Sequence, residues 1–395
     1  MPQLPLFEQS PRDPAFVQDP FPAYERMRAL GPAVFWRDYG MAVFARHADV
    51  AALLRDRRLG RAPAPELAPQ GPPADAFDAF ERLSLLEREP PDHTRLRALV
   101  NRAFTSRAIA GFAPRIRAVA AGLADALPAE EADLMRAYAE PLPVRVIAEL
   151  LGAPPEAAAQ MRAWSHDMTA MYRFAPPPGA RARANAAAQA FGAFMAEVIE
   201  RRRRAPERAL IDALIAAEQD GSRLSRDELI ATSILLMNAG HEATTLAIGL
   251  ALKLALTGAA TPAALAAETG PDEALRLDPP MHLFTRHVRE DLEHAGATLR
   301  RGQVIGLALG AANRDPERFA RPELFDPRRP GLAGHVGLGA GIHFCVGAPL
   351  ARLEMRAAVA ALFARWPRIR LIEAPRFEDR YHFRALGALR VRPAG

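Results

Sequence analysis

The stretch from Gly337 to Gly347 reads G-L-G-A-G-I-H-F-C-V-G, and it contains Cys345, the single cysteine of the chain. Glycine tolerates positive φ and lets the backbone approach a ligand closely. This spacing therefore predicts a loop whose amide groups lie close to a bound group. An apolar helical run follows, and the start of a helix stabilises a thiolate through its dipole and its unpaired amides. Cys345 is therefore a candidate metal ligand. The alternative is a buried cysteine that packs as a small hydrophobic side chain in a glycine turn.

Length and composition limit the type of protein. The chain has 395 residues, of which 50% are hydrophobic, enough for two or three average domains or one large one with a sizeable core. Its N-terminal part has no basic segment followed by an apolar run, so we expect a cytoplasmic protein without a membrane segment. A single cysteine excludes a disulfide framework, an all-cysteine zinc site and a four-cysteine iron–sulfur cluster. Any metal on Cys345 must bring its other ligands.

The formal net charge of +5 rests on arginine, since Lys253 is the only lysine. A basic surface suits nucleic acid, a membrane surface or an acidic protein. The sequence has no nucleic-acid motif and no interleaving of aromatic and basic residues, so we expect no nucleic-acid partner. A membrane surface and an acidic protein remain as partners that a basic surface would suit.

The pattern of apolar residues predicts a mainly helical chain with small sheets. Alternating residues around Asp38-Tyr-Gly40 predict a hairpin over 33–44, and alanine-rich amphipathic segments predict a series of helices over about 92–256. Shorter helices are expected at 22–30 and 47–56, and short strands near 284–288, 304–308 and 369–373. We expect a single domain over residues 1–395, richer in strand over about 30–60 and 284–308, and helical over about 75–280 and 309–365.

The longest predicted helix runs from Ser225 to about Leu256, with Ser225 and Glu228 forming a capping box. Its middle reads Asn238-Ala-Gly-His-Glu-Ala-Thr-Thr245. Glycine inside a helix costs about 1 kcal/mol, and a buried glutamate costs more unless it is paired or functional. One reading is therefore a helix crossing at Gly240 with Glu242 reaching a partner. A zinc site is disfavoured, because no second histidine follows at the H-E-x-x-H spacing.

Three stretches together resemble one known family. The pattern G-x-G-x-H-x-C-x-G, followed by A-P-L-A-R-L-E, resembles the haem-binding loop of bacterial soluble cytochrome P450 enzymes, the haem-thiolate monooxygenases. The stretch around Glu242 is similar to the oxygen-activating segment of that family, usually A-G-x-E/D-T-T. Glu273-Ala-Leu-Arg276, with the proline-rich segment through Phe325-Asp-Pro327, resembles the E-x-x-R helix and the meander that braces it.

The resemblance implies a cytochrome P450-like fold with haem b (iron protoporphyrin IX) buried between the long central helix and the helix that follows the cysteine loop. It implies that Cys345 binds the iron and that Gly347 and Ala239 lie beside the haem. His93 and Arg97 are four residues apart and face one way on a predicted helix. By resemblance the haem propionates are held by His93, Arg97, Arg286 and His343.

The oxygen side departs from the family pattern. By resemblance the catalytic segment includes Gly240, Glu242, Ala243 and Thr244, with the family's acid at Glu242. The alcohol that normally follows this acid, and that holds water for proton delivery, aligns with Ala243. Thr244 is turned by about 100° and cannot simply take its place. Water ordered by Glu242, or a hydroxyl of the substrate, would have to replace it. Leu338 also stands where an aromatic residue normally opens the cysteine loop.

The resemblance implies a monomeric monooxygenase that inserts one oxygen atom of O2 into an apolar or amphipathic small molecule. Electrons would come from an acidic ferredoxin that contacts Arg102, Arg107 and Arg352. Because of Ala243, a peroxide-driven or non-oxygenase haem-thiolate enzyme stays open, as does a haem-binding protein without turnover. The expected substrate pocket draws on 82–86, 168–174, 235–239, 281–283 and Phe383, with Arg82, Arg173 and His282 as partners for a polar or acidic group.

Overall fold

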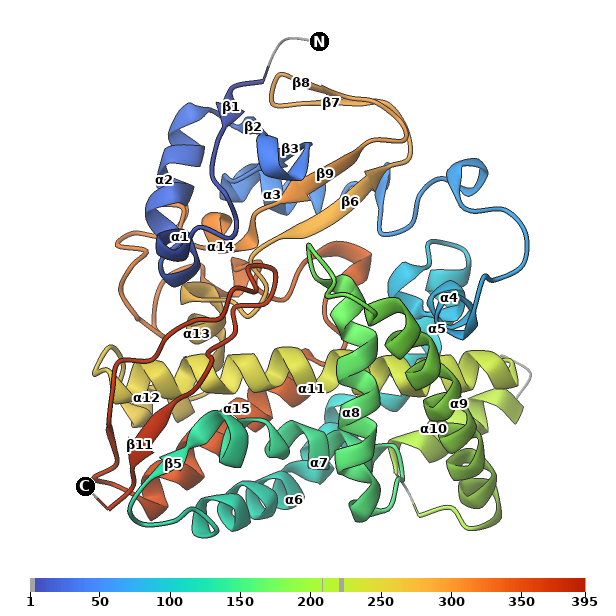
Figure 1. Cartoon of the computed structure of the whole chain (residues 1–395), viewed down its shortest axis with the longest axis vertical. Helices are drawn as coiled ribbons and strands as arrows, with labels where there is room; N and C mark the ends of the chain where they lie inside the picture. Colours follow the sequence, from blue (N-terminus) through green and yellow to red (C-terminus); the bar gives the residue numbers. More distant parts are fainter. Residues whose placement is uncertain (1–3, 208, 220–223, 395) are drawn as a thin grey trace.

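A computed structural model describes residues 4–207, 209–219 and 224–394. Helices fill the lower part of the molecule in Figure 1, and the largest sheet lies above them. The α-helices are α1 (Pro14–Gln18), α2 (Phe21–Leu30), α3 (His47–Leu53), α4 (Ala76–Leu83), α5 (Asp92–Ala103), α6 (Ser106–Asp125), α7 (Pro141–Leu150), α8 (Ala158–Thr169), α9 (Ala180–Arg204), α10 (Leu210–Gln219), α11 (Arg226–Leu256), α12 (Pro262–Ala266), α13 (Gly270–Leu277), α14 (Leu309–Ala312) and α15 (Ala348–Arg365).

The largest sheet has six strands in the order β1-β2-β3-β9-β6-β4. Its strands are β1 (Leu6–Phe7), β2 (Ala33–Trp36), β3 (Met41–Phe44), β4 (Leu59–Gly60), β6 (Phe284–Val288) and β9 (Val304–Leu307). The predicted hairpin is confirmed: β2 and β3 are antiparallel, and Gly40 turns the chain with φ of 61°. The parallel pair of β3 and β9 joins the N-terminal hairpin to the segment that carries Arg286.

The smaller sheets use chain segments that lie far apart in the sequence. β7 (Leu292–His294) pairs with β8 (Ala297–Leu299), and β11 (Arg390–Arg392) lies between β10 (Arg370–Leu371) and β5 (Ala132–Asp133). The strand expected near 369–373 is confirmed, but only over Arg370–Leu371. β5 was not predicted, because a two-residue strand has no alternation of its own to detect.

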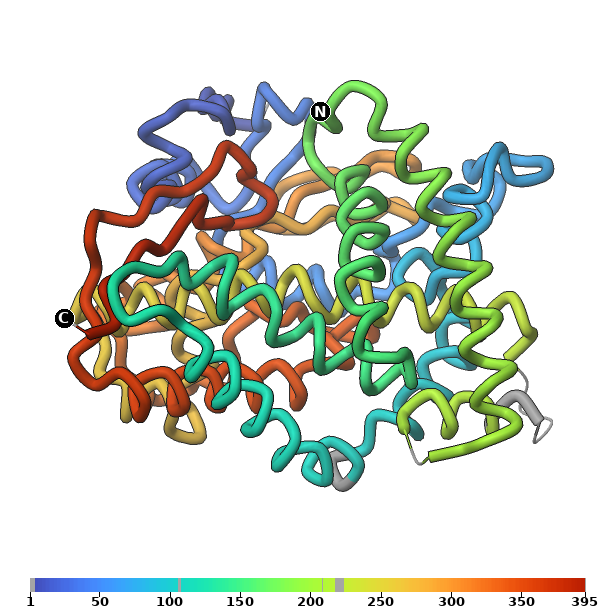
Figure 2. The backbone as a smooth tube through the Cα atoms, turned by 60° about the horizontal axis from the view of Figure 1, so that its bottom comes forward, coloured from blue at the N-terminus to red at the C-terminus, as the bar shows by residue number. Residues whose placement is uncertain are grey.

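The long helix α11 crosses the centre of the molecule in both views (Figures 1 and 2). The predicted capping box is confirmed: Ser225 Oγ accepts a hydrogen bond from the amide of Glu228 at 3.1 Å, and the Glu228 carboxylate accepts from the amide of Ser225 at 2.9 Å. Most of α11 is buried, and it packs against α7, α8, α9 and α15. A Cβ on Gly240 would meet the side chain of Ile147 in α7 at 3.4 Å, so this glycine permits the close helix crossing. Residues 208 and 220–223, which fall within the predicted helical series, lie outside the described residues.

A buried ion pair ties α13 to the segment before the cysteine loop. Both side chains of Glu273 and Arg276 are 0% exposed, and Arg276 Nε lies 2.7 Å from Glu273 Oε2. The remaining donors of Arg276 reach Glu273 Oε1 and three backbone carbonyls, those of Asn313, Pro322 and Leu324. Asn313 Oδ1 in turn accepts from the amide of Val336 at 2.8 Å, directly before Gly337. The pair therefore fixes the backbone behind the cysteine loop.

We expect Arg276→Leu to reduce the free energy of unfolding by about 3–5 kcal/mol, because Glu273 loses its bidentate cation and the carbonyls of Asn313 and Pro322 lose the donor that Arg276 supplies. Urea unfolding followed by circular dichroism measures this difference. Arg115→Leu is the matched control, since the Arg115–Glu149 pair is exposed and is worth less than about 1 kcal/mol. Equal unfolding midpoints for the two variants would contradict the structural role of Arg276.

Candidate functional site

The cysteine loop is shaped by glycines that approach other backbone segments. A Cβ on Gly337 would lie 2.5 Å from the carbonyl oxygen of Leu275, and a Cβ on Gly341 would lie 2.5 Å from that of Leu54. Gly339 and Gly341 also have φ of 71° and 72°, which side chains disfavour. The amide of Cys345 donates to the carbonyl of Leu338 at 3.0 Å and closes the loop. The glycine pattern is thus required by packing and by backbone conformation.

Cys345 lies at the start of α15, whose N-cap residue is Gly347. Burial raises the pKa of its thiol, while the amides of Gly347 and Ala348 and the charges of Arg97 and Arg352 favour the thiolate. A bound metal ion would deprotonate such a thiol outright. Within the described ranges, no three His, Cys, Asp or Glu side chains gather as a metal site. Cys345 therefore suits a metal that arrives with its own equatorial ligands.

Four side chains predicted to hold the propionates gather beside this loop. The rings of His93 in α5 and His343 lie 4.4 Å apart between centroids. Arg97 donates to the carbonyl of Phe344 at 2.7 Å, and Arg286 donates to the carbonyl of Thr285 at 2.8 Å. His93 Nε2 is buried without a hydrogen-bond partner. These four side chains therefore have more N–H donors than the surrounding protein has acceptors for them.

The charges of this group also lack full compensation. Burial, followed by the nearby charge of Arg61, lowers the pKa of Arg286 to about 10. Burial and then His343 lower the pKa of His93 to about 4. An anionic ligand would relieve both effects, because it would supply acceptors and opposite charge in a desolvated place. The unpaired His93 Nε2 and the sparsely bonded Arg286 fit the two carboxylates of haem b.

Glu89 is a central member of this group that the sequence reasoning gave no role. Its carboxylate accepts from His343 Nε2 at 3.0 Å and from the amide of Arg61 at 2.5 Å. Burial raises the pKa of Glu89, but the hydrogen bond and charge of His343 and the amide of Arg61 outweigh it, so the net pKa is lowered. A Cβ on Gly60 would approach this carboxylate to 2.8 Å. An acid four residues before His93 was the signal that the sequence offered.

In the segment of α11 that the resemblance assigns to oxygen activation, two alanines are accessible to solvent. Ala239 is exposed and Ala243 is half-buried, in a helix that is otherwise largely buried, whereas Thr244 is buried. Gly240 faces α7, about 100° around the helix from Ala239. The structure thus places Ala239 and Ala243 together on one accessible strip of α11 and turns Thr244 away from it.

Glu242 forms a buried ion pair with Arg380, and only about a tenth of its side chain is exposed. Burial raises the pKa of Glu242, but the charges of Arg380 and His241 outweigh it, so the carboxyl is held ionised. The second oxygen, Oε2, is buried without a hydrogen-bond partner, as is Oδ1 of Asn238 one turn earlier. Arg380 was missed in the sequence because it lies 138 residues away, in a segment without a local motif.

Of the predicted pocket residues, Phe383 and Met281 gather with Leu246 and Tyr172 in a small apolar cluster. The prediction for His282 is wrong, because its two ring nitrogens bond Tyr24 and Asp278 at 2.7 and 3.0 Å and the side chain is fully buried.

Arg82 is engaged by the carbonyl of Gly71 and by Asp78. Tyr172 Oη donates to Glu81 at 2.7 Å, and burial raises the pKa of Glu81 to about 7. Of the three polar partners predicted for the substrate, only Arg173 has no hydrogen bond or ion pair within the described part of the chain.

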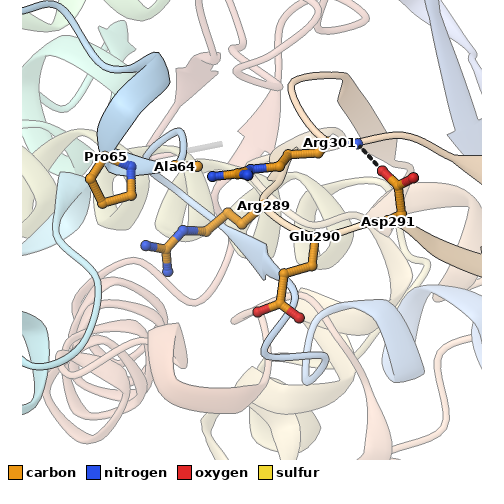
Figure 3. Close-up of a pocket in the computed structure, with 6 residues that line it drawn as sticks. All are labelled: Ala64, Pro65, Arg289, Glu290, Asp291 and Arg301. Atoms are coloured by element: carbon orange, nitrogen blue, oxygen red, sulfur yellow. Dashed lines mark hydrogen bonds between the residues drawn. The ribbon is translucent and has the colours of Figure 1, made fainter.

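A separate surface pocket of about 640 Å³ contains none of the predicted site residues (Figure 3). Asp291 there accepts from the amide of Arg301 and from the side chain of Arg300 at 2.8 and 2.7 Å. Arg301 is also paired with Glu66. Much of the charge of this pocket is thus neutralised within the protein.

Comparison with known proteins gives a consistent result. The family described as "Cytochrome P450" matches residues 157–259 and 272–370. The chain is 38% identical over 366 residues to the vitamin D(3) 25-hydroxylase of Pseudonocardia autotrophica, covering 90% of this chain and 88% of that protein. It is 34% identical over 400 residues to the epothilone C/D epoxidase of Sorangium cellulosum, covering 98% and 95%. A crystal structure of an epothilone D-bound cytochrome P450 superposes with a TM-score of 0.88 at 32% identity, covering 98% of this chain and 100% of that one.

None of the helices that the structure describes combines the length and the apolar character needed to cross a bilayer.

We expect Arg286→Leu to increase the rate of haem transfer to apomyoglobin by about tenfold or more, because losing a charged hydrogen bond costs about 1.5–3 kcal/mol. The transfer is followed by absorbance after mixing the loaded protein with excess apomyoglobin. Arg300→Leu is the matched control, since this arginine pairs with Asp291 on the surface. If both variants retain haem as the unchanged protein does, Arg286 does not hold a propionate.

Proposed function

The chain belongs to the cytochrome P450 family of haem b monooxygenases, and from this premise we propose how its own residues hold the cofactor and serve the reaction. The sequence-based identification of the family, of the mainly helical P450-like fold and of haem-dependent monooxygenase activity is confirmed. Cys345 is proposed as the thiolate ligand of the iron, with Gly347 and Ala239 next to the porphyrin. His93, Arg97, Arg286 and His343 are proposed to bind the propionates.

This assignment rests on one observation: N–H donors that lie beside the only thiol of the chain are buried with few or no acceptors. His93 Nε2 is buried without an acceptor, and Arg286 is buried with one neighbouring carbonyl. A thiolate-bound haem supplies the oxidising power to insert one oxygen atom of O2 into an unactivated carbon–hydrogen bond. The protein's own part is to orient the group, to exclude water from it and to deliver protons.

On the oxygen side we assign proton delivery to Glu242 and its surroundings. The free Oε2 of Glu242 and the free Oδ1 of Asn238 are buried acceptors on adjacent turns of α11. Buried acceptors of this kind are commonly satisfied by ordered water. A water molecule held there would occupy the place beside Ala243 where relatives with threonine have a hydroxyl. Gly240 sets the helix packing at this point, and Thr244 is too far around the helix to contribute its hydroxyl directly.

The substrate is proposed to be an apolar or amphipathic small molecule that lies against the cluster of Leu246, Met281 and Phe383. Electrons are proposed to come from an acidic ferredoxin. Arg102 is exposed and available for such a contact, whereas Arg352 forms an ion pair with Asp272 at 2.8 Å. The side chain of Arg107 lies outside the described residues. We further propose a monomeric cytoplasmic protein in which residues 1–395 form one domain.

Cys345→Ser tests the assignment of the iron ligand. We expect the unchanged protein to give a reduced carbonyl complex with the red-shifted Soret band of a thiolate ligand, and the variant to lose that band. Difference spectroscopy under carbon monoxide measures both. A variant that keeps the band, or an unchanged protein that never binds haem, would refute the proposal.

Ala243→Thr tests proton delivery on the oxygen side. With a substrate found by spin-state screening, ferredoxin and its reductase, we expect the threonine variant to convert a larger share of its electrons into product. Ala243→Val is the matched control, because valine has nearly the same shape without the hydroxyl. Product yield and peroxide release are measured together. Identical gains for threonine and valine would argue against a missing hydroxyl, and product with peroxide alone would favour the peroxide-driven alternative.

A further inference from the structure

The C-terminal hairpin, residues 376–387, reaches from the edge of the molecule to the middle of α11. Phe377 pairs with Leu386 to close it, the amide of Glu378 donates to the carbonyl of Ala385 at 2.9 Å, and Phe383 pairs with Met281. These contacts hold the hairpin against the segment after α13. They place Arg380 against Glu242, next to the accessible strip of α11.

A second arginine, on another element, lies within electrostatic reach of the same carboxylate. Arg173 follows the short helical turn Ala170–Tyr172 at the end of α8. Arg380, Glu242 and Glu378 all act electrostatically on Arg173, whose pKa is lowered by burial and then by Arg380. No hydrogen bond or ion pair engages Arg173 within the described ranges, and its Nε is buried without an acceptor. The two arginines therefore share one region.

In the buried part of this region, the positive charges outnumber the negative ones. Of the two carboxylates that act on both arginines within the described part of the chain, Glu242 is buried, whereas Glu378 is 44% exposed and lies 3.5 Å from Arg380. Arg380 uses Nη2 for Glu242, while its Nε is buried without an acceptor. Two guanidinium groups thus lie within electrostatic reach of one buried carboxylate, and only that of Arg380 is paired with it. Unused buried donors of both arginines remain for a second anion, which Arg380 can bind without releasing Glu242.

The neighbouring surface is apolar. Leu246, Phe383, Met281 and Tyr172 form one apolar cluster. Tyr172 directly precedes Arg173 in the sequence, and the guanidinium of Arg380 lies over the ring of Phe383. A ligand that satisfies both surfaces has a charged end and a hydrocarbon body. Guanidinium groups bind carboxylates through paired, nearly planar hydrogen bonds, so a carboxylate suits this geometry.

We propose that Arg173 and Arg380 bind the carboxylate of an amphipathic carboxylic acid substrate, whose apolar part lies against Leu246, Met281 and Phe383. This inference rests on the proposed function, since it names the class of substrate for the same site. Arg173 is a specificity-determining residue in this arrangement. Arg380 has two tasks, because it keeps Glu242 ionised and also binds the substrate.

The test compares matched pairs of ligands on the haem-loaded protein. Linear saturated carboxylic acids of eight to sixteen carbons and their methyl esters are titrated by spin-state shift and by calorimetry at pH 7.5. We expect at least one acid to bind tenfold or more tightly than its ester. Arg173→Gln should reduce that ratio to about threefold or less, since it removes one of the two guanidinium groups that bind the carboxylate. Arg380→Lys, which retains the charge for Glu242 but loses the planar fork, should reduce it as well.

Arg82→Gln is the matched control, because Arg82 lies in α4 and is engaged by Gly71 and Asp78. It should keep the full preference for the acid. The proposal is wrong if no acid of the series binds more tightly than its ester, if Arg173→Gln keeps the preference, or if Arg82→Gln loses it equally. The reduced carbonyl spectrum, recorded on every sample, reports separately on the iron ligand. A normal spectrum with no preference for acids would overturn the substrate class and leave the proposed function standing.

Discussion

The guanidinium of Arg276 is the group on which the haem-binding side of the molecule depends. Its five donors are all used, two on Glu273 and three on the carbonyls of Asn313, Pro322 and Leu324. A buried pair of this kind contributes little net stability compared with a well-packed apolar core, but it specifies one arrangement of the chain. Here the specified arrangement is the path of the segment that ends at Val336, directly before the cysteine loop.

Two other buried carboxylates lie at the two parts of the proposed site, Glu89 at the part assigned to the haem propionates and Glu242 at the part assigned to oxygen and substrate. Glu89 joins His343 to the loop at Arg61, and Glu242 joins α11 to the C-terminal hairpin through Arg380. In both places the cations and donors outnumber the carboxylates. On the proposed assignments, the compensating acceptors at these two places are the haem propionates and the carboxylate of the substrate.

Local features were predictable from the sequence, and contacts between distant segments were not. The capping box of α11, the hairpin around Gly40 and the buried Glu273–Arg276 pair each have a short signature in neighbouring residues. The pairing of Glu242 with Arg380 joins positions 138 apart, and that of Glu89 with His343 joins positions 254 apart, without any periodic signal. His282 was misplaced for the same reason, since its partner Tyr24 lies 258 residues away. The family resemblance supplied the candidate residues for the propionates, and it could not supply partners that lie outside the family motifs.

The two tight glycine contacts of the cysteine loop have a consequence for protein engineering. Gly337 and Gly341 are pressed against the backbone carbonyls of Leu275 and Leu54, and backbone atoms cannot move aside as a flexible side chain can. Leu338, between them, is half-buried and packs on the main core through its side chain. A library designed to tune the redox potential should therefore keep both glycines and vary position 338. A different side chain there changes the surroundings of the sulfur and leaves the loop backbone in place.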